Sequence, residues 1–273
     1  MNKDIDKIIN KYIDKHKINQ KFVQSAKSTY QIDRNEKCPC GSGQKYNNCC
    51  GKVIPDKDYE HYLNKLSPFI NNANPIKNMD KEVLNKFYII AKEAAQNFPV
   101  NPLILDIAGS IAYELNNFNE SAAYIQKHYN IVKNEISEDS LFTLIHSLLE
   151  LNRTKKAERL ITEVIKDNDS LALLMTMTEI KFSLGKVNEG YKYGIRAYKK
   201  SGEDLYLLDR LLKLFIQNKL YEKAFPLIKK NYFKFEKSGN KPETTKYIIE
   251  NLVEAVFLID NPALLTDDDY FAY

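Results

Sequence analysis

Apolar side chains recur every three to four residues along most of this chain, which is the spacing of amphipathic α-helices. From residue 57 onward the pattern predicts helices over 57–70, 80–97, 102–116, 119–134, 138–151, 154–167, 170–184, 187–200, 204–217, 220–236 and 243–260. Short breaks that contain Asn, Gly or Pro separate these segments. No alternation of period two is long enough to predict a strand. The chain is therefore predicted to be all-α.

The N-terminal residues 3–30 also have the pattern of an amphipathic helix. Its apolar stripe consists of Ile5, Ile8, Ile9, Tyr12, Ile13, Phe22, Val23 and Ala26. Such a helix either packs on the rest of the protein or lies on a membrane surface. The opposite face carries charges of both signs, for example Lys7 and Asp14, which favours packing over membrane binding.

The predicted helices from residue 102 onward form four pairs, whose second helices are 119–134, 154–167, 187–200 and 220–236. A similar short segment stands at the start of each second helix. Each segment ends on a small residue, and these residues are Ser121, Ala157, Gly190 and Ala224. They are 36, 33 and 34 residues apart. A small side chain at this position allows the second helix to cross the first closely, and the residues one turn later lie on the same face. Those later residues are Ile125, Ile161, Gly194 and Ile228.

A period near 34 residues with two helices per unit is that of the tetratricopeptide repeat. Residues 102–236 resemble this family in a degenerate form. Leu115, Leu151 and Leu184 end three of the four first helices, and Asn218 departs from this pattern. The chain has no Trp, and the Leu-Gly pair of the family survives only as Ala108-Gly109.

This resemblance implies a right-handed α-solenoid of helix pairs. Helices 57–70 and 80–97 would form an irregular first pair, and 243–260 would cap the C-terminal end. Stacks of this kind bind a protein or peptide client. The candidate contacts on the first helices are Asp106, Ser110, Tyr113, Thr143, Ser147, Thr176 and Lys181.

All four cysteines of the chain lie between positions 38 and 50, in the pattern Cys-x-Cys, eight residues, Cys-Cys. A disulfide framework distributes its cysteines, whereas a single metal site gathers them. Zn²⁺ binds four thiolates in a tetrahedron, and the stretch Gly41-Ser42-Gly43 allows the chain to reverse between the two pairs. A 2Fe–2S cluster also takes four cysteines, but at other spacings. We predict one structural Zn²⁺ bound by Cys38, Cys40, Cys49 and Cys50.

Residues 33–52 are similar to the SEC-C motif, the small zinc-binding element at the C-terminal end of the preprotein-translocase motor ATPase. The residues that carry the match are Arg34-Asn35, Cys38-Pro39-Cys40-Gly41-Ser42-Gly43, Lys45-Tyr46 and Cys49-Cys50-Gly51. Lys37 stands where the family usually has Pro, and Cys50 stands where the motor ATPase usually has His. The resemblance implies zinc ligation and a docking element for a secretion chaperone or the ribosome.

Two interpretations of the remaining residues of this segment stay open. In the docking interpretation, Arg34, Lys37, Lys45 and Tyr46 are exposed groups that contact a partner. In the structural interpretation, Tyr46 packs over the metal loop and the charges are solvated.

The predicted organisation is an N-terminal helix in 1–32, the zinc-binding motif in 33–54, the repeat body in 57–265 and an acidic tail in 266–273.

The net charge of +4 is uneven, because residues 1–56 carry +5 and the rest of the chain carries −1. This bias gives an alternative function, a nucleic-acid or ribosome binder that uses the basic N-terminal segment with Arg34, Lys37, Lys45 and Lys52. The bias is mild, so the sequence favours a protein client over nucleic acid.

No catalytic motif is visible in the sequence. The four histidines lie on separate predicted helices, no phosphate-binding loop is present, and a Cys₄ zinc site keeps no position open for water. We expect a non-enzymatic interaction protein, with an effector or enzyme that has a site without a motif as a second alternative. With a mean hydropathy of −0.46, no long apolar run and no signal peptide, a bacterial-type cytoplasmic protein is expected.

Overall fold

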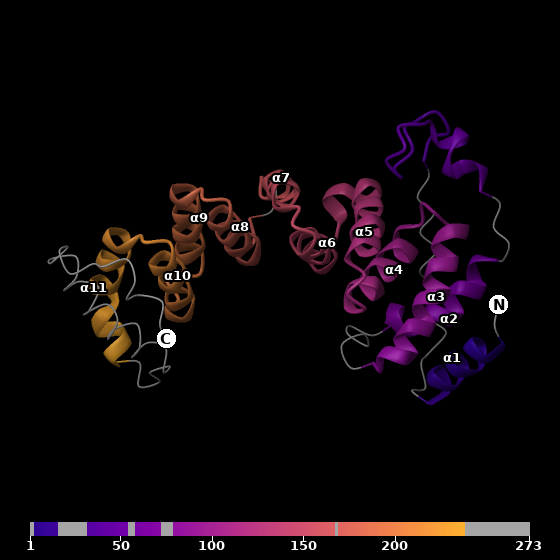
Figure 1. The fold of residues 1–273 in the computed structure, drawn as a ribbon, viewed down its shortest axis with the longest axis horizontal. Coiled ribbons are helices and arrows are strands. Elements are labelled where there is room, and N and C mark those ends of the chain that lie inside the picture. The colour runs from indigo at the N-terminus through magenta and orange to yellow at the C-terminus, as the bar shows by residue number, and fades with distance from the viewer. Residues whose placement is uncertain (1–2, 16–31, 54–57, 72–78, 167–168, 238–273) are drawn as a thin grey trace. The chain divides into compact units, whose positions relative to one another are not determined.

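The computed structural model describes residues 3–15, 32–53, 58–71, 79–166 and 169–237, and Figure 1 shows the fold. Apart from an isolated β-bridge between Lys37 and Lys45, the regular elements in these ranges are helices. The α-helices are α1 (Lys3–Lys15), α2 (Tyr59–Asn71), α3 (Lys81–Asn97), α4 (Pro102–Glu114), α5 (Phe118–Val132), α6 (Glu138–Glu150), α7 (Thr154–Val164), α8 (Leu171–Ser183), α9 (Val187–Lys200), α10 (Leu205–Gln217) and α11 (Tyr221–Lys237). The all-α prediction is confirmed.

The ten helices predicted between residues 57 and 236 are all present, with ends that agree to within three residues. Of the helix predicted over 3–30, α1 covers the part that the structure describes. The predicted cap helix 243–260 and the acidic tail 266–273 lie outside the described residues. In the described part of the chain, no helix has the length and apolar character needed to cross a membrane.

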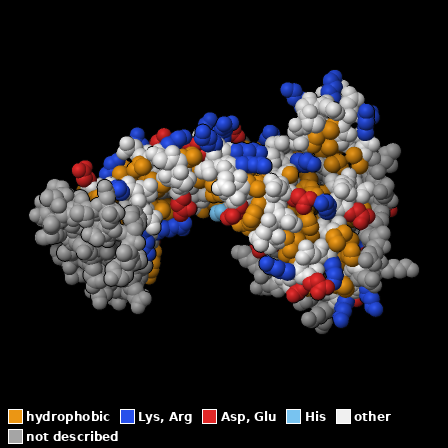
Figure 2. All heavy atoms as spheres, in the orientation of Figure 1, with side chains coloured by type: hydrophobic (Ala, Val, Ile, Leu, Met, Phe, Trp, Pro, Cys, Tyr) orange, Lys and Arg blue, Asp and Glu red, His pale blue; other side chains and the backbone are white. Residues whose placement is uncertain are grey.

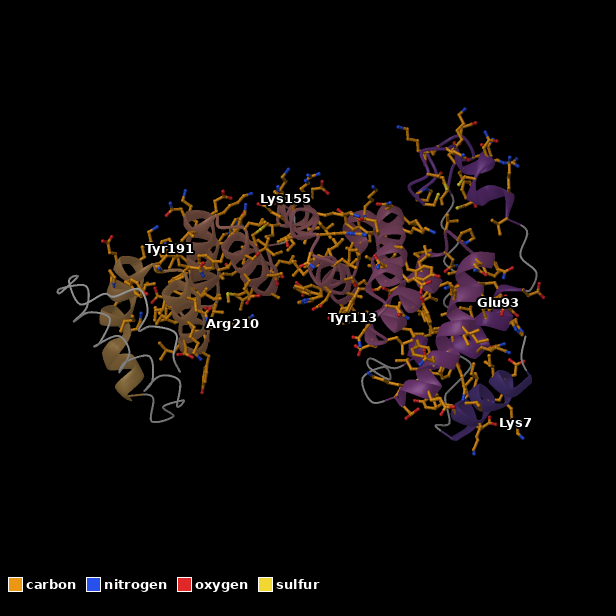
Figure 3. All side chains as sticks on the ribbon, in the orientation of Figure 1. Lys7, Glu93, Tyr113, Lys155, Tyr191 and Arg210 are labelled. Carbon is orange, nitrogen blue, oxygen red and sulfur yellow. The ribbon has the colours of Figure 1, made fainter. Side chains whose placement is uncertain are left out.

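The chain divides into two compact units, residues 1–157 and 158–273. In the first unit, α1 packs against α2 and α3 with Ile9 and Ile13 buried. The ring of Tyr12 meets that of Phe87 edge-on, with centroids 5.6 Å apart. Lys7 lies on the exposed side of α1 (Figure 3). The apolar face of α1 is therefore part of a protein core, as the mixed charges on its other face predicted.

Four successive helix pairs are α4/α5, α6/α7, α8/α9 and α10/α11. The first helix of each pair begins with the same capping geometry. The capping residues are Asn101, Ser137, Ser170 and Asp204, spaced by 36, 33 and 34 residues. In each case the side-chain oxygen accepts a hydrogen bond of 2.8–3.3 Å from the backbone N–H three residues later. The bond satisfies a backbone donor that the first turn leaves without a helical partner.

The turn inside each pair repeats as well. The C-cap residues of the first helices are Leu115, Leu151, Leu184 and Asn218. The next residue has a positive φ, of 61°, 56°, 70° and 58° at Asn116, Asn152, Gly185 and Lys219. The residue after it donates its N–H to the carbonyl five positions earlier, at 2.7–2.8 Å. This is the Schellman arrangement. The four pairs therefore share one local geometry, at the intervals found in the sequence.

The small residues predicted at the helix crossings are buried. Ser121, Ala157 and Ala224 have no exposed surface, and Gly190 is buried on α9. A Cβ added to Gly190 would lie 2.8 Å from the ring of Phe182 on the preceding helix. This distance is too short for a real contact, so the absence of a side chain at position 190 is what allows α9 to approach α8.

The prediction that Ser147 and Lys181 are surface contacts is wrong, because both side chains are buried. Ser147 donates to the hydroxyl oxygen of Ser121 at 2.9 Å. Lys181 is 6% exposed and pairs with Glu158 at 2.7 Å and with Glu189. Burial opposes the charge of Lys181, but the two carboxylates outweigh it and raise the pKa of this lysine. The other candidates are half-buried, namely Asp106, Ser110, Tyr113, Thr143 and Thr176.

Replacing Gly190 by leucine is expected to destabilise the protein by about 1–3 kcal/mol, the usual cost of adding bulk to a filled contact. Thermal unfolding followed by circular dichroism measures this as a lower midpoint. Ala172→Leu is the control, because it adds similar bulk on an exposed position of α8. Equal midpoints for the two variants would show that Gly190 is not the point of closest approach.

Candidate metal centre

Residues 32–53 form a small loop structure, called here the knuckle, whose two halves are joined by backbone hydrogen bonds. The N–H of Cys38 donates to the carbonyl of Gln44 at 2.7 Å, and the N–H of Tyr46 donates to the carbonyl of Glu36 at 2.8 Å. Between them, Gly41 and Gly43 have φ values of 85° and 74°, a region that favours glycine. The reversal predicted from Gly41-Ser42-Gly43 is confirmed.

The second half of the knuckle consists of two 3-10 turns, Tyr46–Asn48 and Cys50–Lys52. They place Cys49 and Cys50 opposite the first pair, and the N–H of Cys49 donates to the carbonyl of Tyr46 at 3.1 Å. A Cβ on Gly51 would lie 2.8 Å from that carbonyl oxygen and 3.2 Å from the Tyr46 ring. The half-buried ring of Tyr46 therefore packs against Gly51 inside the knuckle.

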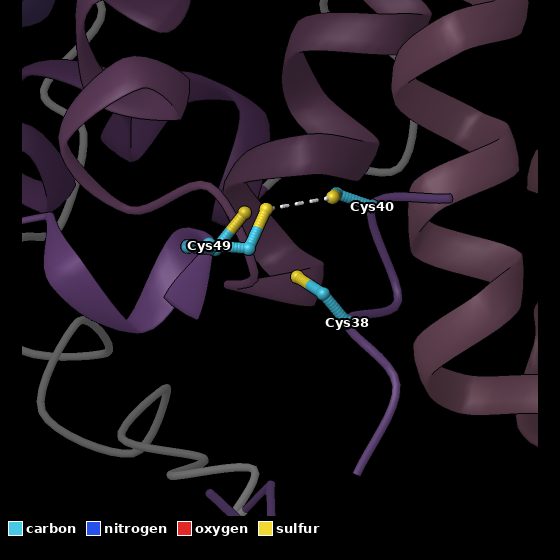
Figure 4. A group of neighbouring side chains, drawn as sticks. Cys38, Cys40 and Cys49 are labelled. Atoms are coloured by element: carbon cyan, nitrogen blue, oxygen red, sulfur yellow. Dashed lines mark hydrogen bonds between the residues drawn. The ribbon is translucent and has the colours of Figure 1, made fainter. Parts of the chain in front are cut away.

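The four cysteine side chains converge without forming a disulfide (Figure 4). Their Sγ atoms all lie within 4.8 Å of one another, and those of Cys40 and Cys49 are 3.4 Å apart. Four sulfurs at about 2.3 Å from a tetrahedral Zn²⁺ lie about 3.8 Å from one another. The donor set therefore fits a tetrahedral metal ion. Within the described ranges, these cysteines are the one group of metal-ligating side chains with such spacing.

The ionisation of the thiols also depends on the knuckle. Burial of Cys40 opposes its ionisation, but hydrogen bonds from Ser42, Cys38 and Cys49 outweigh burial and lower the pKa of Cys40 to about 6. Burial raises the pKa of Cys38 and of Cys50, and the neighbouring cysteines add to the rise at Cys50. Four thiolates at this spacing repel one another, whereas a bound divalent cation compensates their charge and allows all four to ionise.

The charged residues suggested as partner contacts lie on the surface of the knuckle. Arg34, Lys37 and Lys45 are exposed, and so is Lys52. Figure 2 shows Lys and Arg side chains that project from this part of the molecule. Tyr46 differs from them because its ring is half-buried against Gly51.

A contact between the knuckle and α5 has no counterpart in the sequence pattern. The side-chain Nδ2 of Asn130 donates to the carbonyl oxygen of Pro39 at 3.0 Å. Pro39 stands between two of the cysteines, Cys38 and Cys40. The two partners of the bond are 91 residues apart in the chain, and neither position has a pattern that links it to the other.

Comparison with known proteins relates the knuckle to a protein family. The SEC-C motif family matches residues 34–52. The chain is 49% identical over 39 residues to the protein translocase subunit SecA of Wolinella succinogenes, covering 14% of this chain and 4% of that protein. It is 57% identical over 30 residues to SecA of Clostridium botulinum strain Hall, covering 11% and 4%. For SecA of Campylobacter curvus the identity is 49% over 43 residues, covering 15% and 5%.

The chain thus spans only about one twentieth of the length of these relatives. The similarity lies in the segment that holds the four converging thiols. The resemblance of residues 33–52 to the SEC-C motif, predicted from the sequence, is therefore confirmed.

Proposed function

We propose that this protein is a non-enzymatic, zinc-binding adaptor of the cytoplasm. Cys38, Cys40, Cys49 and Cys50 hold one structural Zn²⁺. The helix pairs bind a protein or peptide client, and the knuckle docks a second partner such as a chaperone, a secretion component or the ribosome. The convergence of four free thiols within a SEC-C motif is the observation that carries this proposal.

The composition of the knuckle supports a structural role for the metal. Cys38 is the one buried residue in the range 32–53, so this segment has no apolar core of its own. A metal ion that joins Cys38 and Cys40 to Cys49 and Cys50 supplies the missing cross-link. Four thiolates also complete a tetrahedral coordination shell, which is typical of structural zinc rather than of zinc that activates water.

The helix pairs support an adaptor role in a different way. Four pairs with the same cap and the same turn form a repeated scaffold. Their resemblance to tetratricopeptide repeats suggests a protein or peptide client. The similarity of the knuckle to part of a translocase subunit suggests that its partner belongs to protein secretion or synthesis.

Purified protein is expected to contain about one zinc per chain, and Cys38→Ser or Cys49→Ser is expected to release it because each removes one of four thiolates. Metal analysis by mass spectrometry gives the stoichiometry. Asn48→Ser is the control, since it changes an exposed neighbour of Cys49. Most of the helical circular dichroism should remain after zinc loss, because the helix pairs have their own core. A wild-type protein free of zinc would refute the assignment.

The exposed Arg34, Lys37, Lys45 and Lys52 favour a second candidate function, the binding of nucleic acid through the knuckle. Cations that contact phosphates release counterions, so such binding weakens steeply as salt is added. On the adaptor proposal, the wild type captures proteins from native lysate that has been treated with nuclease. Cys49→Ser no longer captures these proteins, whereas Asn48→Ser still does. Capture that nuclease abolishes, together with steep salt dependence for an RNA probe, would support the second candidate instead.

A further inference from the structure

The hydrogen bond between Asn130 and Pro39 joins the knuckle to the helical body, meaning helices α1–α11, at the loop that carries Cys38 and Cys40. The carbonyl oxygen of Pro39 that accepts the bond belongs to the peptide unit that leads into Cys40. Because a peptide unit is planar, fixing this oxygen also fixes the direction in which the backbone enters Cys40. The ring of Pro39 restricts the same short loop further.

The donor on α5 is oriented by a neighbour. Nε2 of Gln126 donates to Oδ1 of Asn130 at 3.2 Å, one helical turn earlier on α5. Since Oδ1 of Asn130 accepts this bond, its Nδ2 is the atom that faces Pro39. The amide of Asn130 therefore accepts on one side and donates on the other, and both bonds require this one orientation.

The helix that carries Asn130 is firmly held on its other face. Ile125 is fully buried, and His128 is 8% exposed with its Nδ1 2.9 Å from the carbonyl oxygen of Pro102. A side chain on such a helix is a better support for a metal loop than one on a mobile segment. Residues outside the ligand set that orient the ligands commonly affect metal affinity.

We propose that Asn130 is a positioning residue of the metal centre, which links zinc occupancy to the docking of the knuckle on α5. This inference rests on the proposed zinc function. When Asn130 holds Pro39, Cys40 is presented to the other three thiolates, so the ion binds a loop that is already placed. By thermodynamic linkage, bound zinc strengthens the docking on α5 by the same factor as docking strengthens zinc binding.

Asn130→Leu tests the proposal, because leucine has a similar size and no donor. Competition with a chromophoric chelator is expected to show about a three- to tenfold loss of zinc affinity, the range for losing one neutral hydrogen bond. Asn130→Asp should lose at least as much zinc affinity, because a carboxylate then faces the carbonyl oxygen of Pro39. Asn119→Asp controls for the added charge, since it alters an exposed residue of the same helix.

Hydrogen exchange supplies a readout that separates coupling from simple destabilisation. In the wild type, zinc is expected to slow amide exchange in α5 as well as in the knuckle. In Asn130→Leu, zinc should still protect the knuckle, but its effect on α5 should disappear. Unchanged affinity and unchanged zinc-dependent protection of α5 in this variant would overturn the inference while leaving the zinc assignment intact. A wild-type protein that binds no zinc would overturn both.

Discussion

The need to satisfy backbone hydrogen-bonding groups at helix ends fixes the geometry on which the helix pairs depend. A helix leaves donors without partners at its start and acceptors without partners at its end. Here the donors meet the side-chain oxygens of Asn101, Ser137, Ser170 and Asp204, and the acceptors meet the N–H groups of one recurring turn. Because cap and turn are repeated, the chain leaves the first helix of each pair in the same local conformation, and the small residue near the start of the second helix is buried in every pair.

The helical body and the knuckle are stabilised by different means. In the body, side chains such as Ile104, Leu144 and Leu211 are removed completely from water, so burial of apolar surface is its main source of stability. In the knuckle only Cys38 is fully buried, and the two halves are joined by a few backbone hydrogen bonds. On the proposal of a structural zinc site, the metal ion supplies the cross-link that the knuckle lacks, whereas the helices have an apolar core of their own.

The sequence predicts what repeats locally and fails where distant segments meet. The intervals of Ser121, Ala157, Gly190 and Ala224 are visible because small residues have a physical role at each crossing. The capping residues have the same intervals, but they are of three types, so their period is concealed until the hydrogen bonds are seen. Burial of Lys181 could not be predicted, because a lysine is ordinarily exposed and its two carboxylate partners lie on neighbouring helices.

The same distinction applies to the metal centre. Its four ligands lie within thirteen residues, so their chemistry and spacing are sufficient to predict the site. The support for the site comes from Asn130, which carries no signal in the sequence because asparagine is common on helix surfaces and its partner is a backbone oxygen. A motif that is complete in its ligands still needs a scaffold to set its orientation. In this chain the scaffold contact, at Pro39, falls between Cys38 and Cys40, which is why we propose that the docking of the knuckle and the binding of the metal are coupled.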